Sequence, residues 1–411
     1  MADRALERAT AGFDTQDRAW LLELVYGTLR LRGRLDHLIG RRVHRGLASL
    51  QADVLDVLRL GAYQLIEMGG VPDYAAVSQS VDMARAEAGQ GAARLVNGVL
   101  RGLGSAEWDG TPFEQDPAGY LTTWGSHPRW LVDRWIARWG APAAQKLVER
   151  DNSRPGVFLR PVGVGTGEAI RLLQDAGIAA QPVEGFPSAL SLPTGTSPSA
   201  ALAVVPAVVQ DPAAGSVVDY AGLPAEAVLA DLCAAPGGKA MVLASAATAG
   251  GRVIAADRSI RRMARVRENW QRLPVMPVYG IVADARWPPI RPMDGVLLDV
   301  PCTGTGTLAR HPDARWRVGP DELRALVKLQ REILQGAARA VRPGGVLVYA
   351  TCSLEPEENE IQVELFLEDH PEFALEPGSA PASMLDAQGR LFLLPHVHGF
   401  DGAFAARLRR R

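Results

Sequence analysis

Cysteine is scarce in this chain of 411 residues, which contains only Cys233, Cys302 and Cys352. An odd and widely spaced set cannot form the disulfide framework of a small secreted protein, and it lacks the paired short spacings of a zinc site. We therefore expect no metal centre. The three thiols should be free, each with a role in packing or in chemistry.

Long hydrophobic runs and an excess of one charge are also missing. No run approaches the roughly 18 apolar residues of a membrane-spanning helix, and the charged first residues lack the apolar core of a signal peptide. We expect a cytoplasmic protein that does not bind membranes. The chain has 44 basic and 46 acidic residues, with a formal charge of -2, so any surface for nucleic acid must be a local patch. Lysine occurs only as Lys146, Lys239 and Lys328.

The composition, 47% hydrophobic and 22% charged, is that of a folded protein with two or three domains. Apolar residues recur at helical spacing from Thr15 to about Leu103, and Gly104–Gln115 has the composition of a linker. A helix with three tryptophans then leads into short strand-like pieces, and strands alternate with helices from Val228 onward. We expect an all-α domain at 1–110, a small α+β domain at 120–210 and an α/β domain at 211–411.

Glycines and acids follow successive strands of the predicted α/β domain. The first strand ends in Asp-Leu-Cys-Ala-Ala-Pro-Gly-Gly-Lys (231–239), which is neither a phosphate-binding loop nor the G-x-G-x-x-G dinucleotide motif. Asp257, Asp284 and Asp299 end or follow the next three strands. Ligands bind at the carboxyl ends of parallel strands, and an acid after the second strand accepts hydrogen bonds from ribose hydroxyls. The pattern favours an adenosine cofactor without a diphosphate, S-adenosylmethionine above all.

Two of the three cysteines lie at strand ends of the same sheet, in Pro-Cys302-Thr and Thr-Cys352-Ser. A lone cysteine is usually a small packing residue. A thiolate can also add to C6 of a pyrimidine, which makes C5 nucleophilic. A free thiol is mostly protonated at neutral pH, so we expect a cation such as Lys239, or a helix beginning near Glu355, to favour the thiolate. These considerations do not decide which cysteine is the nucleophile.

Together these motifs resemble those of the RNA 5-methylcytosine methyltransferases. The residues that carry the resemblance are Cys-Ala-Ala-Pro-Gly-Gly-Lys (233–239), Asp257, Asp284, Asp-Val-Pro-Cys-Thr-Gly-Thr-Gly (299–306), Thr-Cys-Ser (351–353) and Asp-Gly-Ala-Phe (401–404). The helical N-terminal region, with Glu-Leu-Val-Tyr-Gly-Thr-Leu-Arg (23–30) and Leu-Gly-Ala-Tyr-Gln-Leu (60–65), resembles the NusB-like domain. This pairing is typical of the RsmB (Sun) type, which modifies small-subunit (16S) ribosomal RNA.

The resemblance implies a Rossmann-like α/β methyltransferase domain whose last strand is antiparallel, an all-α NusB-like N-terminal domain and a small α+β middle domain. It implies 5-methylcytosine formation in ribosomal RNA by a monomer. The residues it assigns to S-adenosylmethionine are Cys233, Ala234, Ala235, Pro236, Gly237, Gly238, Lys239, Asp257, Asp284 and Asp299. It also makes Cys352 the nucleophile and Cys302 the helper that releases the methylated base. Asp299 would hydrogen-bond the cytosine, with Lys239 orienting both.

Two other functions remain open on the sequence. In a DNA cytosine methyltransferase the nucleophile would be Cys302 of the Pro-Cys motif, although the NusB-like region and the absence of a large DNA-target domain argue against this. An RNA-binding scaffold that has kept the fold would not require both cysteines, Asp299 and Lys239 together. Arginines cluster at 30–45 and 258–272, where they form either an RNA-phosphate footprint or a solvated helix face.

Overall fold

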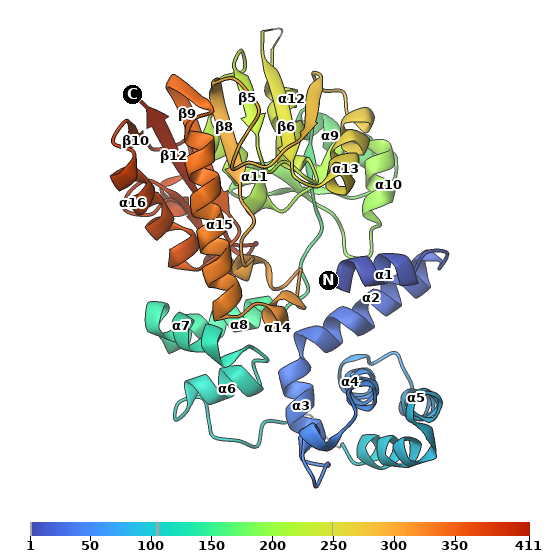
Figure 1. Ribbon diagram of the computed structural model, residues 1–411. Helices are drawn as coiled ribbons and strands as arrows, with labels where there is room; N and C mark the ends of the chain where they lie inside the picture. The colour runs from blue at the N-terminus through green and yellow to red at the C-terminus, as the bar shows by residue number, and fades with distance from the viewer. Residues whose placement is uncertain (1, 104–106, 249) are drawn as a thin grey trace. The chain divides into compact units, whose positions relative to one another are not determined.

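The computed structural model describes residues 2–103, 107–248 and 250–411, and it divides into two compact units (Figure 1). The first contains residues 1–154 and 308–319, and the second contains residues 155–307 and 320–411. The start of the expected linker, 104–106, lies outside the described residues, while 107–115 forms no helix or strand. The sequence predicts three domains, whereas the chain forms two units, each made of two stretches of chain.

The first unit is helical in its described residues. Its helices are α1 (Ala2–Ala9), α2 (Thr15–Arg30), α3 (Arg32–Gly40), α4 (Ala52–Glu67), α5 (Asp73–Arg101), α6 (Pro117–Thr123), α7 (Arg129–Trp139), α8 (Ala141–Asp151) and α14 (Ala314–Arg317), with a short 3-10 turn at η1 (Leu47–Ser49). Leu35, Leu58 and Val96 are fully buried in the core that α3, α4 and α5 share. Helix α5 is broken at Gly89, whose φ of 79° lies in the left-handed region. The predicted all-α N-terminal region is confirmed.

Residues 308–319 join this unit although their neighbours in sequence belong to the other. The guanidinium of Arg315 is fully buried and donates to the carbonyl oxygens of Arg30, Ser126 and Asp151, at 3.0–3.2 Å. It also donates to Oδ1 of Asn152 at 2.8 Å. Burial lowers its pKa to about 10. One buried arginine thus donates hydrogen bonds to backbone carbonyl oxygens at or near the ends of several helices.

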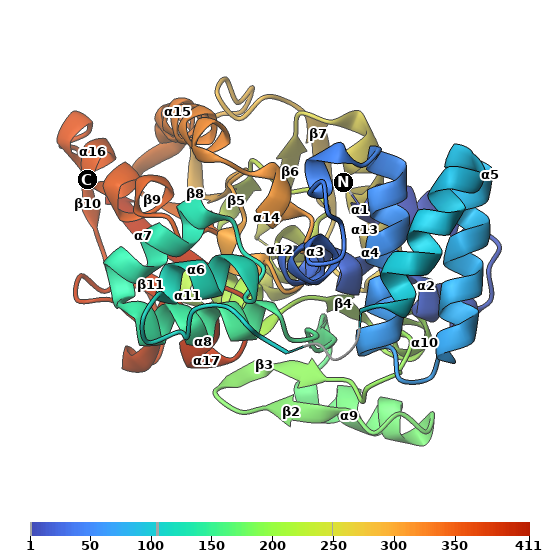
Figure 2. The same ribbon diagram turned by 90° about the horizontal axis from the view of Figure 1, so that it is seen from below.

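The second unit begins with a small antiparallel sheet in the order β2-β3-β1-β4. Its elements are β1 (Phe158–Pro161), α9 (Thr166–Asp175), β2 (Gln181–Val183), β3 (Phe186–Ser191), α10 (Pro198–Val204) and β4 (Ala207–Val209). One face, with Leu159 and Leu190, packs against α9 and α10, and Figure 2 shows α9 beside β2 and β3. The other face, with Phe158 and Phe186, is buried against α11. The α+β middle region is confirmed.

The large sheet of the second unit has eight strands, in the order β10-β12-β9-β8-β5-β6-β7 with β11 paired to β12. The strands are β5 (Val228–Asp231), β6 (Arg252–Asp257), β7 (Val278–Val282), β8 (Met293–Asp299), β9 (Val341–Thr351), β10 (Phe373–Leu375), β11 (Leu391–Leu393) and β12 (Ala403–Arg410). Strands β9, β8, β5, β6 and β7 are parallel, and β12 runs antiparallel to β9. The predicted parallel sheet with an antiparallel last strand is confirmed.

Helices cover both faces of this sheet. They are α11 (Pro212–Ala221), α12 (Gly238–Ala246) and α13 (Ile260–Arg272) on one face, and α15 (Pro320–Ala338) and α16 (Glu360–Asp369) on the other. Short turns occur at η2 (Thr305–Thr307), η3 (Pro356–Glu358), η4 (Ala382–Met384) and α17 (Pro395–His398). Figure 1 shows α15 lying along β8 and β9. Neighbouring residues alternate between the two layers, as with Leu297 and Leu298, so the central strands are apolar throughout.

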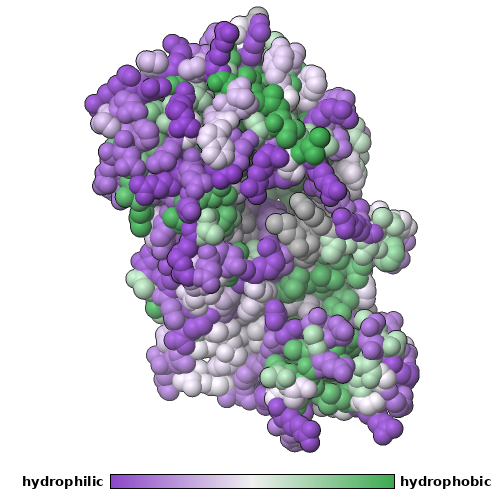
Figure 3. All heavy atoms as spheres, in the orientation of Figure 1, coloured by the Kyte–Doolittle hydropathy of each residue, from purple (hydrophilic) through white to green (hydrophobic). Residues whose placement is uncertain are grey.

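Hydrophilic side chains cover most of the visible face of the second unit (Figure 3). Among the described helices, none is long and apolar enough to cross a membrane. The strand order reverses at β5, which pairs with β6 on one side and β8 on the other. Such a switch point, outside the carboxyl ends of the strands, is where open α/β sheets bind ligands.

Candidate active site

The turn after β5 brings the backbone to the carboxyl edge of the sheet. Gly237 has a φ of 110°, and a Cβ there would lie 3.2 Å from the Cα of Val266, so only glycine fits. Helix α12 begins at the next residue. Beneath the turn, Oδ1 of buried Asp231 accepts a hydrogen bond from the Cys233 amide at 3.3 Å. Burial and the neighbouring charge of Asp299 raise the pKa of Asp231 to about 7.

A cavity of about 240 Å³ lies at this edge of the sheet. Of the residues predicted from the sequence, its walls contain Cys233, Ala235, Asp257, Asp284, Asp299, Cys302 and Cys352. Lys239 reaches this set through Asp299, and Ala234 is buried in the turn. Pro236 is exposed. The strand-end residues that the sequence analysis selected therefore meet at one site.

Arginines that the sequence analysis did not assign to the site hold two of its acids. Asp257 is nearly fully buried, and its Oδ2 lies 3.3 Å from Nη1 of Arg262. Nη2 of Arg286 lies 2.8 Å from Oδ2 of Asp284, and these hydrogen bonds lower the pKa of that carboxyl. The acids are thus oriented and partly neutralised. The only lead in the sequence was the arginine-rich stretch that follows Asp257.

Lys239 forms an ion pair with Asp299 of the cavity wall, with Nζ 2.7 Å from Oδ2. Burial alone lowers the pKa of Lys239, but the charge of Asp299 and its hydrogen bond outweigh burial and raise it. Asp231 and the Cys352 side chain raise it further. The Lys239 ammonium is therefore a positive charge close to Asp299, Asp231 and Cys352.

Two of the three cysteines that line the cavity lie side by side, with Cys302 Sγ 3.4 Å from Cys352 Sγ. The amide of Gly306 donates to the carbonyl oxygen of Cys352 at 2.9 Å, which ties the two loops together. The hydrogen bond with Cys352, in which the Cys302 thiol is the protonated partner, together with burial, raises the pKa of Cys302 well above its usual range. The lowered thiol pKa that we expect of the nucleophile is therefore not found at Cys302. No long helix begins at Glu355, because a 3-10 turn at Pro356–Glu358 precedes α16.

Beneath the cysteine loops lies a polar cluster that the sequence analysis did not select. Glu358 and Asn359 are both fully buried, and each hydrogen-bonds to residues that flank a cysteine. Burial raises the pKa of the Glu358 carboxyl. The only signal for these two residues in the sequence was their position, because Glu358 follows Cys352 by six residues.

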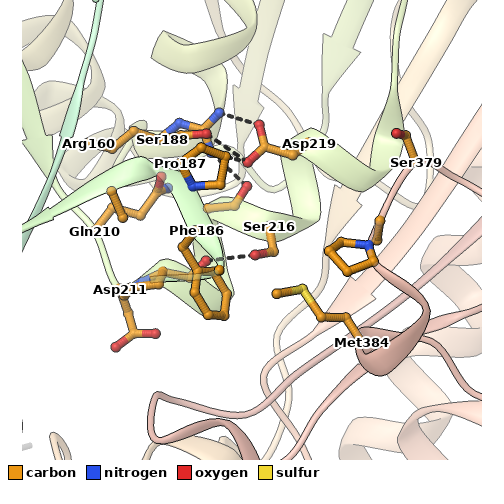
Figure 4. A pocket seen from close by; sticks show the side chains of 16 residues that line it. Arg160, Phe186, Pro187, Ser188, Gln210, Asp211, Ser216, Asp219, Ser379 and Met384 are labelled. Atoms are coloured by element: carbon orange, nitrogen blue, oxygen red, sulfur yellow. Dashed lines mark hydrogen bonds and ion pairs between the residues drawn. The ribbon is translucent and has the colours of Figure 1, made fainter. Parts of the chain in front are cut away.

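A second cavity of about 420 Å³ lies between the small sheet, α11 and residues 379–384 (Figure 4). Arg160 crosses its wall and pairs with Asp219, with Nη2 2.6 Å from Oδ1, and Ser188 donates to the same carboxylate. Phe186 and Met384 supply apolar surface. This lining contains no cysteine and no lysine, whereas three cysteines line the strand-end cavity.

The arginine clusters divide between structural and exposed positions. In the first cluster Arg30 is buried and donates to the carbonyl oxygen of Ala309, whereas Arg42 and Arg45 are exposed. Arg34 packs over the ring of Trp124 at 4.4 Å. Only part of the cluster is therefore available to a phosphate backbone. Among the described residues, no group of three or more His, Cys, Asp or Glu is placed to hold a metal ion.

Three family models match successive parts of the chain. Residues 1–104 match the NusB family, 127–197 match the ferredoxin-like domain of RsmF/B-like methyltransferases, and 223–409 match the 16S rRNA methyltransferase RsmB/F. The solved structure of PH0851 superposes with a TM-score of 0.82 at 27% identity, covering 100% of this chain and 94% of that one. A methyltransferase homologue from Pyrococcus horikoshii gives a TM-score of 0.59 at 26% identity, with coverages of 72% and 99%.

Curated relatives align along nearly the whole chain. The probable ribosomal RNA small subunit methyltransferase B of Synechocystis is 34% identical over 99% of this chain and 94% of its own length. The ribosomal RNA small subunit methyltransferase B of Vibrio cholerae is 35% identical over 99% and 93%. The sequence resemblance is thereby confirmed, and with it the dependence on S-adenosylmethionine. The chain belongs to the RsmB/F family of ribosomal RNA methyltransferases, with an N-terminal NusB domain.

Proposed function

We propose that this protein forms 5-methylcytosine in small-subunit (16S) ribosomal RNA through a covalent adduct between Cys352 and C6 of the target base. The observation that carries the proposal is the placement of the Cys352 and Cys302 thiols, 3.4 Å apart in a cavity whose wall also contains Asp299, the ion-pair partner of Lys239. The family models support the substrate class. Such a substrate would place the protein in the cytoplasm, and we propose that it acts there as a monomer. The N-terminal (1–110) and middle (120–210) regions would bind RNA beside a catalytic region at 211–411.

The site fits S-adenosylmethionine on the character of its polar groups. Asp257 and Asp284 offer carboxylates to ribose and base, and the Gly237–Gly238 turn leaves room for backbone contact. Arg262 and Arg286 pair with Asp257 and Asp284. Among these four residues, no unpaired cation remains that could bind a diphosphate. When bound, the cofactor supplies the electrophilic methyl group.

The proposed roles of the side chains follow from their surroundings. The Cys352 thiolate adds to C6 of cytosine, and the electron pair of the C5–C6 bond moves to C5, which takes the methyl group. A water molecule then takes the proton from C5, the electron pair of the C5–H bond re-forms the C5–C6 double bond, and the C6–S bond breaks to return the thiolate. Asp299, held by Lys239, hydrogen-bonds the cytosine. Cys302 has a raised pKa and remains a thiol, so it suits the helper role in release better than the nucleophilic role.

The test compares two cysteine variants on transcribed small-subunit RNA. Cys352→Ala is expected to abolish methylation and adduct formation. Cys302→Ala is expected to accumulate an adduct that resists SDS. Bisulfite sequencing of RNA from a strain lacking the protein, beside its parent, locates the base. Methylation by the Cys352 variant, or an adduct on fluorocytosine DNA rather than RNA, would overturn the proposal.

A further inference from the structure

Each cysteine loop is held by a different buried side chain from one dipeptide, Glu358-Asn359. The two residues lie where η3 ends and α16 begins, and both have no exposed surface. The backbone of Asn359 has φ and ψ of -117° and -104°, outside the helical region, so the two side chains leave the chain in different directions. This permits one dipeptide to serve two loops.

Glu358 holds Thr303, which follows Cys302, directly, and it reaches Pro301, which precedes Cys302, through Gln330. Its Oε1 accepts the amide of Thr303 at 2.9 Å, and its Oε2 accepts the Thr303 hydroxyl. Its Oε1 also accepts Nε2 of Gln330 at 2.8 Å, and that same amide donates to the carbonyl oxygen of Pro301 at 2.9 Å. Glu358 therefore fixes the backbone before and after Cys302.

Asn359 does the same for the other loop. Its Oδ1 accepts the hydroxyl of Thr351 at 2.5 Å, and its Nδ2 donates to the carbonyl oxygen of Ser353 at 2.8 Å. The Thr351 hydroxyl also accepts the Ser353 amide at 3.1 Å. The residues on both sides of Cys352 are thus held by one amide side chain.

A purely structural cluster would have no need for this division. The amide of Leu354 and the hydroxyl of Ser353 already link the loops through Thr305, at 2.9 and 3.3 Å. The Glu358 and Asn359 contacts add a further hold on each cysteine loop, and the Thr303 and Ser353 hydroxyls, 3.0 Å apart, join the two sides. A carboxyl taken out of water is costly, and here its contacts with Thr303 and Gln330 lie on the Cys302 side, while a hydrogen bond with the Ser353 side chain reaches it from the Cys352 side.

We propose that Glu358 is the positioning residue for Cys302 and Asn359 the positioning residue for Cys352, so that the two control release and attack separately. The inference rests on the proposed function. Glu358→Gln keeps the shape of the side chain but removes its charge and one acceptor. Asn359→Asp keeps the acceptor for Thr351 and replaces the donor to Ser353 with an oxygen that repels the carbonyl.

The experiment measures single-turnover methylation and SDS-resistant adduct on transcribed small-subunit RNA with S-adenosylmethionine. Glu358→Gln should raise the standing adduct roughly tenfold while first-turnover methylation stays near the parent level. Asn359→Asp should lower both adduct and first-turnover methylation roughly tenfold. Glu368→Gln, the same replacement at an exposed position of α16, is the matched control and should behave as the parent.

A second measurement needs no RNA. The charge of Glu358 is among the causes that raise the pKa of the Cys302 thiol, so Glu358→Gln should speed alkylation of Cys302 by iodoacetamide and leave Cys352 at its parent rate. Asn359→Asp should change the rate at Cys352 alone. Binding of S-adenosylmethionine should be unchanged in both.

The inference is overturned if the two variants change adduct and alkylation in the same way, or if either matches the Glu368→Gln control. A parent chain that forms no adduct with any RNA contradicts the proposed function instead. In that event the alkylation rates still decide whether each side chain governs its own cysteine.

Discussion

The Sγ atoms of Cys302 and Cys352 lie 3.4 Å apart, although 50 residues separate them in sequence. Parallel strands β8 and β9 bring them together, because Asp299 pairs in register with Ala350 and each cysteine follows its strand by a similar number of residues. The third cysteine, Cys233, follows β5 on the other side of β8. The geometry therefore distinguishes one close pair from a separate thiol.

This arrangement predicts a selective cross-link. Diamide, which oxidises two thiols while it is reduced to the hydrazine, should join Cys302 to Cys352 with little backbone movement and stop methylation. Dithiothreitol should restore activity. Mass spectrometry of an unreduced digest identifies the linked peptides, and Cys233→Ala is the control that should cross-link as the parent does. Recovery of Cys233 in the main disulfide would contradict the predicted geometry.

Much of the site could be predicted because each motif ends a strand. Asp257, Asp299 and Cys352 follow separate apolar runs, and the carboxyl ends of parallel strands meet at one edge without any knowledge of side-chain contacts. The order of motifs along the chain therefore already contained the cofactor loop, the acids and both thiols. The inference that these residues meet at one edge depended on one topological rule.

The positioning groups could not be predicted in this way. Glu358 and Arg286 act through partners on other elements, and nothing in their local sequence distinguishes a buried carboxylate or a paired guanidinium from a solvated one. Arg30 shows the opposite error, because it lies in a basic cluster that suggested phosphate contacts yet is buried against Ala309. Burial of a charge depends on the tertiary structure, which composition does not report.

The Lys239–Asp299 pair predicts a stability difference that depends on pH. The pKa of Lys239 is raised in the fold above its ordinary value of 10.5. The pair therefore stabilises fully below that value, and the stabilisation is lost as pH rises through the folded-state pKa. Asp299→Asn should be less stable than the parent near neutral pH, and the gap should narrow above about pH 10.5. Urea unfolding across this range measures it, and a gap independent of pH would contradict the prediction.

Gly306 is expected to tolerate no side chain. A Cβ there would lie 2.8 Å from both the carbonyl oxygen of Cys352 and the Cα of Gly402, so the loops would have to separate. Gly306→Ala should cost about 1–3 kcal/mol of unfolding free energy and most of the activity. Gly167→Ala, on helix α9 with open space around the added methyl, is the control and should be neutral or slightly stabilising. Chemical denaturation and methylation assays on both variants provide the comparison.

Arg286 should influence cofactor affinity without touching the cysteines. Its guanidinium bonds Asp284 and Glu332, and it lowers the pKa of the Asp284 carboxyl. Arg286→Ala should weaken S-adenosylmethionine binding roughly tenfold near neutral pH, because Asp284 loses its fixed orientation. Without Arg286, the pKa of the Asp284 carboxyl should return toward its ordinary value. As the pH is lowered, the variant should therefore lose affinity at a higher pH than the parent does. Calorimetry across pH measures both effects. Exposed Arg291→Ala is the control, and equal losses in the two variants would refute the assignment.

Arg315 is expected to stabilise the first unit through its buried guanidinium. Replacement by methionine leaves the carbonyl oxygens of Arg30, Ser126 and Asp151 without this donor, and each such loss in a buried place is costly. The free energy of unfolding should fall by roughly 3 kcal/mol or more. Arg317→Met removes a half-exposed arginine of the same segment that pairs with Asp313, and it should cost under about 1 kcal/mol. Hydrogen exchange should show the loss of protection in residues 1–154 for the Arg315 variant alone, and equal effects of the two replacements would mean that the buried contacts do not hold the segment in place.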